Sequence, residues 1–164
     1  RPAITHYGKT QTLPRNVGME FLLGGGFARK TSGDAAFFDS QLYQQFDLHI
    51  SETVLEEIKK ATAEKQTQLF QLIDRYQPTL LSSNAKVREL AKAYLDHQIL
   101  PMKSLYDAQH IAFATVYELE VILSWNLKHI ANLHRQQRVQ AINRLYGYTN
   151  PLPMITLLEV SHYE

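Results

Sequence analysis

Residues 104–126 read SLYDAQHIAFATVYELEVILSWN, and they indicate the fold class of the chain. Its first part carries apolar and small residues at helical spacing, which predicts a helix that opens at Ser104. Residues 120–124 are short and β-branched, as is typical of a buried parallel strand. Trp125 and Asn126 follow at the carboxyl end of that strand. A helix that leads directly into a buried strand indicates an α/β domain.

The rest of the chain continues this alternation. We expect strands at 17–23, 47–50, 79–81 and 154–160, and helices at 34–46, 51–65, 67–76, 84–96 and 127–145. Such an order predicts a three-layer α/β/α domain, in which helices cover both faces of a mostly parallel central sheet. The helix over 84–96 is expected to begin at an Asn84 cap and to bury the stripe that ends at Tyr94.

Length and composition fit one globular domain over residues 1–164. Hydrophobic residues make up 45% of the chain and charged residues 20%, which argues against a disordered tail. The absence of cysteine from the sequence excludes disulfide frameworks and thiolate zinc sites. Residues 1–16 form an atypical polar extension without the apolar core of a signal peptide, so we expect a cytoplasmic protein. No apolar run approaches the roughly 20 residues of a membrane span, and we expect no membrane partner.

The net charge is only +1, but its distribution is uneven. Glu20 is the only acid among residues 1–33, and residues 121–158 contain no acid. A basic rim beside an acidic pocket is the layout that a metal-dependent nuclease needs to hold phosphates next to cations. The alternative is that these charges lie on ordinary solvated helix faces.

Three oxygen-bearing side chains are predicted near the carboxyl ends of parallel strands, where ligands bind in open α/β sheets. They are Glu57, Asp107 and Asn126. Together they would suit a hard cation such as Mg²⁺. Each also has an ordinary explanation: Asp107 as the acid of a capping box with Ser104, Glu57 as a surface acid, and Asn126 as a turn residue. A second capping box is expected where Glu56 follows Thr53 by three residues.

Two segments, SLYDAQHIAFA at 104–114 and VILSWNLKHIAN at 121–132, resemble the C-terminal half of PIN-domain proteins. The likeness is to the subgroup that carries a Ser-Trp-Asn-Phe-Lys-His-Ile signature. The segment HISETVLEEI at 49–58 resembles the strand-to-helix segment of that family, and residues 147–148 and 155–160 resemble its tail. The resemblance extends from about residue 37 to residue 160.

The resemblance implies a PIN-like α/β/α fold and an acidic pocket that binds Mg²⁺ or Mn²⁺ and cleaves RNA. The helix acid of the family falls on Glu57, and the acid that opens the later helix falls on Asp107. Where many members have another Asp, this chain has Asn126, as its subgroup does. Many relatives are toxins of VapC-type toxin–antitoxin pairs, so an antitoxin protein and a homodimer are the expected partners besides RNA. The side chains expected to neutralise phosphates are Lys128, Arg135 and Arg138.

The chain departs from the family at its first strand. Family members end that strand with an Asp, and the aligned residues here are Met19, Glu20 and Phe21. Glu20 is the nearest acid, but it is one position away, and a slip of one residue turns a side chain to the opposite face. The alternative function is therefore a catalytically impaired PIN-fold module that binds RNA or protein.

Two further features of the sequence partly match known phosphate-binding and zinc-binding patterns. The glycine-rich segment at 24–31 nearly fits a phosphate-binding loop, but Arg29 stands where the second required glycine belongs. His110 and His129 are interpreted as helix-border residues and not as zinc ligands, because neither belongs to a metal-binding pair at helical spacing.

Overall fold

The computed structural model describes residues 3–6, 9–12, 16–20, 47–124, 133–151 and 154–155. Side chains are described for residues 47–120, 122 and 133–151. Helices and parallel strands alternate in these segments, so the α/β class is confirmed. The helix predicted at 34–46 lies outside the described residues.

Five parallel strands form the main sheet. They are β3 (Asn16–Glu20), β4 (Asp47–Ser51), β5 (Thr79–Leu81), β6 (Val121–Ser124) and β7 (Met154–Ile155), in the spatial order β5-β4-β3-β6-β7. The first strand of the main sheet, β3, is thus its central strand. The chain then adds β4 and β5 on one side of β3, and afterwards β6 and β7 on the other side. The direction of winding reverses between β3 and β6, and in open parallel sheets the crevice for a ligand lies at the carboxyl ends of two such strands.

The strand register aligns the carboxyl ends of the central strands. Gly18 of β3 pairs with His49 of β4 on one side and with Ile122 of β6 on the other. Two residues further along, Glu20 pairs with Ser124, and the same register continued on the other side brings it level with Ser51. Because alternate residues of a strand share a face, positions 18 and 20 of β3 belong to the same face of the sheet.

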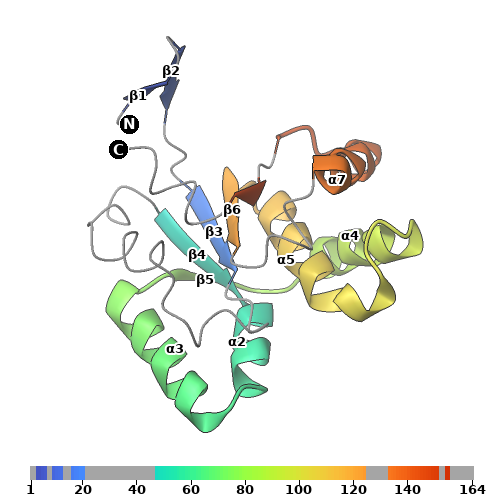
Figure 1. Ribbon diagram of the computed structural model, residues 1–164. Helices are drawn as coiled ribbons and strands as arrows, with labels where there is room; N and C mark the ends of the chain where they lie inside the picture. The colour runs from blue at the N-terminus through green and yellow to red at the C-terminus, as the bar shows by residue number, and fades with distance from the viewer. Residues whose placement is uncertain are drawn as a thin grey trace.

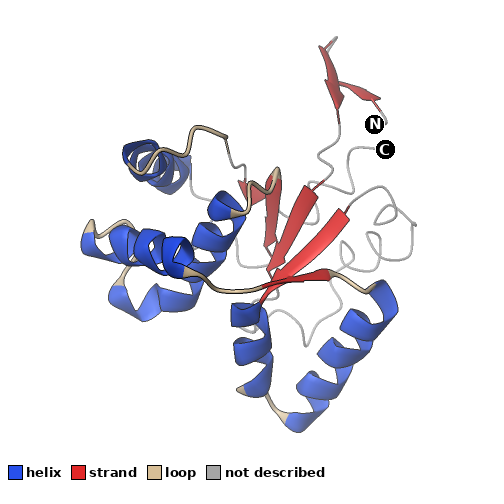
Figure 2. Ribbon diagram, turned by 180° about the vertical axis from the view of Figure 1, so that it is seen from behind, coloured by secondary structure: helices blue, strands red, loops and turns tan. Residues whose placement is uncertain are grey.

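Helices lie in two groups around the sheet (Figures 1 and 2). Beyond one end of the sheet are α2 (Glu52–Lys59) and α3 (Ala63–Tyr76). Beside it are α4 (Ala85–Asp96), α5 (Leu105–Val116) and α7 (Leu133–Leu145). A short 3₁₀ helix, η2 (Met102–Ser104), leads into α5.

The main hydrophobic core lies where α4 and α5 pack together over the sheet. The predicted stripe of α4 is buried there, with Tyr94 fully enclosed, and Ile122 contributes from β6. The Tyr94 hydroxyl donates a hydrogen bond to Asn143 of α7, whose amide donates in turn to the Thr115 hydroxyl at 3.3 Å. This chain of bonds satisfies polar groups that would otherwise be costly to bury. Burial raises the pKa of Tyr94, so its phenol stays neutral.

The N-terminal segment forms a hairpin that the sequence patterns did not predict. Strands β1 (Ala3–His6) and β2 (Lys9–Thr12) pair antiparallel in a two-stranded sheet of their own. Among the described parts of the chain, no helix is long and apolar enough to cross a membrane.

Both predicted capping boxes are wrong. The Thr53 hydroxyl donates to Gln109 of α5 and lies inside α2, where Ser51 occupies the N-cap position. Ser104 does occupy the N-cap position of α5, but its side chain makes no capping bond. The helix predicted over 51–65 ends earlier than expected, at Lys59. The Asn84 cap is confirmed, because its side-chain oxygen accepts from the Val87 amide at 2.9 Å.

Replacing these two N-cap residues is expected to give different results. Asn84→Ala removes a real capping bond and should lower the free energy of unfolding by about 1 kcal/mol, because one amide at the start of α4 loses its acceptor. Ser104→Ala removes no such bond and should leave stability nearly unchanged. Urea denaturation of the two variants beside the parent chain measures this difference, and equal losses in both would contradict the assignment of the caps.

Candidate functional site

Helices α2 and α5 are joined by three side-chain contacts, which we call the α2–α5 seam. The contacts pair Thr53 with Gln109, Glu57 with His110, and Lys60 with Tyr106. Thr53 and Glu57 of α2 contact the middle of α5, whereas Lys60, directly after α2, contacts Tyr106 in the first turn of α5. The seam therefore sets the start of α5 against the end of α2.

Glu57 and His110 form the buried centre of the seam. Glu57 Oε2 lies 2.8 Å from His110 Nε2, and the two residues are only 7% and 5% exposed. Glu57 is buried because it follows the apolar stripe of α2, in which Val54 and Ile58 are fully enclosed. Removing one partner of a buried pair leaves the other charged or polar group without compensation, so each side chain depends on the other.

Asp107 is the second buried acid of the predicted site. It is 8% exposed and stands in the first turn of α5, three residues before His110. Residues three apart on a helix share a face, so Asp107 lies on the side of α5 that carries the partner of Glu57. The fold thus buries both predicted acids, 50 positions apart in the sequence, one on α2 and one on the side of α5 that carries His110.

The carboxyl edge of the sheet leads into this junction. Ser51 ends β4 and immediately precedes α2, and it is 5% exposed. Its buried hydroxyl has no hydrogen-bond partner among the described residues. A buried hydroxyl without a partner is costly, and such groups are often completed by an ion or a water molecule. Strand register brings the backbone of Glu20 level with Ser51, on the neighbouring strand β3.

The other predicted site residues are distributed differently. Asn126 and Lys128 lie outside the described residues, as do His129 and the glycine-rich segment at 24–31. Arg135 and Arg138 stand on α7, which is separated from α2 by α4 and α5 in both views (Figures 1 and 2). Arg138 donates to the carbonyl oxygen of His97 at 3.2 Å and so ties α7 to the end of α4.

Sequence reasoning missed the contacts that His110 and Lys60 make at the seam. His110 was expected at a helix border, yet it is buried and bound to Glu57. Lys60 is exposed, and its ammonium donates to the Tyr106 hydroxyl and lies 4.5 Å from the centre of that ring. The position of His110 three residues after Asp107 was a usable signal, since it places both on one face of α5.

Residues of the described segments form no cluster of three His, Asp or Glu side chains arranged to hold a metal ion. Glu57 and Asp107 supply two acids. Further oxygen ligands would have to come from the predicted positions Glu20 and Asn126, whose side chains lie outside the described set.

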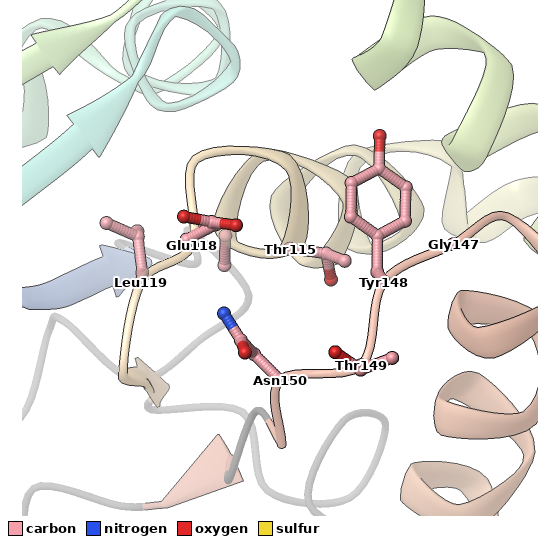
Figure 3. Close-up of a pocket in the computed structure, with 8 residues that line it drawn as sticks. Thr115, Glu118, Leu119, Gly147, Tyr148, Thr149 and Asn150 are labelled. Atoms are coloured by element: carbon pink, nitrogen blue, oxygen red, sulfur yellow. The ribbon is translucent and has the colours of Figure 1, made fainter.

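A small hollow lies at the C-terminal end of α5 (Figure 3). It is bounded by the turn after α5 and by residues 147–150, and in Figure 3 the Asn150 amide points toward Glu118 across it. Its volume of about 60 Å³ corresponds to roughly two water molecules. This hollow is too small for a nucleotide and lies away from both buried acids.

Comparison with family models, with curated proteins and with solved structures found no match for this chain.

The Glu57–His110 contact should make a measurable contribution to stability. His110→Leu leaves the Glu57 carboxylate buried without its partner and should lower the free energy of unfolding by about 3 kcal/mol. His97→Leu, at an exposed histidine, serves as the control and should have little effect. In a double-mutant cycle with Glu57→Leu, the two changes should be far from additive, and additive losses in urea denaturation would show that the contact carries no coupling.

His49 gives the fold a dependence on pH. Burial lowers the pKa of His49, and the nearby charge of Asp47 raises it by a smaller amount. Neither ring nitrogen of His49 has a hydrogen-bond partner among the described residues. The neutral ring is favoured in the fold, so its contribution to stability is present above the ordinary pKa of 6.5 and is lost as pH falls through the lower folded value. His49→Leu should therefore reduce the slope of unfolding free energy between about pH 7 and pH 5, whereas His97→Leu should preserve it. Identical slopes in all three proteins would contradict this.

Proposed function

We propose that the chain is a divalent-metal-dependent ribonuclease with a three-layer, PIN-like α/β/α fold. The observation that carries the proposal is the burial of two acids, Glu57 at the α2–α5 seam and Asp107 in the first turn of α5, in a domain with a parallel sheet. Carboxylates are seldom buried without a partner of opposite charge or a metal ion. Two buried acids, on helices that begin near the carboxyl edge of a sheet whose winding reverses, support a cation site.

The chemistry of the donors fits Mg²⁺ or Mn²⁺. Glu57 uses Oε2 toward His110, which leaves Oε1 as a ligand atom, and Asp107 supplies a second carboxylate. Hard cations take oxygen ligands, and Mg²⁺ commonly binds one or two carboxylates and keeps several waters. Ser51 supports the fit, because its buried hydroxyl lacks a partner at the same edge. We propose Asn126 as a third ligand and Glu20 as a fourth contributor at the end of β3.

The side chains of the seam would have distinct roles. A bound divalent cation supplies an activated water and offsets negative charge on the phosphate. Glu57 and Asp107 hold the cation in position. His110 orients the Glu57 carboxylate through its 2.8 Å contact, as outer partners do for metal ligands in general.

A second candidate is a binding module of the same fold that does not cleave RNA. One observation favours it: His110 satisfies one oxygen of Glu57. On this reading the pair is a structural connection between α2 and α5. An antitoxin partner and a homodimer stay predictions under either function.

A metal titration with cleavage assays separates the two candidates. Mg²⁺ should bind the parent chain saturably by calorimetry, and Glu57→Gln and Asp107→Asn should each weaken binding by about tenfold or more and abolish Mg²⁺-dependent cleavage of single-stranded RNA. Glu56→Gln is the matched control, because Glu56 is the exposed neighbour of Glu57 on the same helix, and it should behave as the parent. Absence of Mg²⁺ binding at millimolar concentration would reject the nuclease and favour the module.

A further inference from the structure

A hollow beside the seam carries positive charge next to the candidate metal site. It lies where α2 ends and α3 begins, facing the first turn of α5, and its volume is about 350 Å³. Its lining consists of Glu57, Lys60, Ala61, Thr62, Lys65 and Tyr106. This volume lies within the range of about 300–1,000 Å³ that small-ligand sites occupy. Since Glu57 lines the hollow and also belongs to the seam, the hollow and the proposed cation site share a wall.

Two lysines set the charge of the hollow. Lys60 donates to the Tyr106 hydroxyl and lies over its ring, so its ammonium is held at the wall. The hydrogen bond to Tyr106 raises the pKa of Lys60, which keeps the group charged. Lys65 is partly buried in the first turn of α3 and forms no ion pair with another described residue. The single acid of the lining, Glu57, is engaged by His110.

The start of α3 adds to this field. Thr62 occupies the N-cap position, and its side chain makes no capping bond, so the first amides of this 14-residue helix have no side-chain acceptor. The N-terminal end of a helix carries partial positive charge and favours anions. The uncapped helix end and both ammonium groups therefore belong to one hollow.

We infer that this hollow binds a backbone phosphate of single-stranded RNA adjacent to the phosphate at the Glu57–Asp107 site. The inference rests on the proposed function and adds the direction in which the strand lies, across the end of α2 toward α3. RNA is favoured over an acidic peptide because the hollow joins the metal site directly, and a strand held at one phosphate must place a neighbouring phosphate close by. Lysine acts as a point charge toward phosphate, which does not require a particular base.

The inference is tested by the binding of a fluorescein-labelled single-stranded oligoribonucleotide, followed by anisotropy in EDTA so that no cleavage occurs. Lys60→Gln and Lys65→Gln should each raise Kd on the order of fivefold at low salt, and each should reduce the slope of log K against log salt by about 0.7. Lys59→Gln is the matched control, since Lys59 is an exposed lysine at the end of α2 outside the lining, and it should leave Kd unchanged. Both tested lysines are accessible, and thermal melts verify that the variants fold as the parent does.

Three results would overturn the inference. The first is unchanged RNA affinity in both pocket variants, and the second is an equal loss in Lys59→Gln. The third is competition by an oligoglutamate peptide of equal charge that displaces RNA as well as unlabelled RNA does, which would assign the hollow to acidic peptides.

Failure of the subsite can be told apart from failure of the nuclease. If Asp107→Asn loses cleavage while the lysine variants keep the parent Kd and KM, the nuclease stands and the subsite is rejected. If the parent chain neither binds Mg²⁺ nor cleaves RNA, yet Lys60→Gln and Lys65→Gln weaken oligoribonucleotide binding, the nuclease is rejected and the phosphate subsite stands.

Discussion

The buried contact between Glu57 and His110 is the interaction on which the rest of the site depends. It crosses from α2, which begins at the carboxyl edge of the sheet, to α5, which packs in the main core with α4. An ionised carboxylate removed from water is strongly destabilising unless a partner compensates it, and α2 is therefore anchored to one position along α5. That position also fixes Asp107 beside the junction and sets Tyr106 against Lys60.

Much of the fold could be predicted from the sequence, because its strands and helices carry strong local patterns. β5 was predicted at its observed bounds, and α4 was predicted with its Asn84 cap and its buried stripe. The hairpin at β1 and β2 was missed because its strands have no alternation of apolar residues and pair only with each other. The capping boxes failed because spacing alone does not show whether a hydroxyl faces its own helix or a neighbour, and Thr53 bonds to α5.

The candidate site was predictable only in part, because local sequence patterns do not show which distant segments come into contact. Glu57 and Asp107 were chosen from their places after a strand and at a helix start, and both are buried. The side chains that complete the seam come from segments far apart in the sequence, and local residue spacing does not predict such contacts. Lys60 illustrates this, since its role is decided by Tyr106, 46 positions away. The register continued from Gly18 and His49 brings the backbone of Glu20, at the end of β3, level with Ser51 of β4, and the role of Glu20 stays a prediction.

The order of the strands has a consequence for how the molecule is assembled during synthesis. β3 is the first strand of the main sheet to leave the ribosome, yet it is central, and one of its two neighbours, β6, begins only at residue 121. Contacts between segments so far apart in the chain form slowly, and an unpaired strand edge invites association with other chains. Helices α4 and α5 are close in sequence and can pack before β6 exists. The open edge of β3 is therefore the part of the nascent chain that a chaperone has most reason to cover.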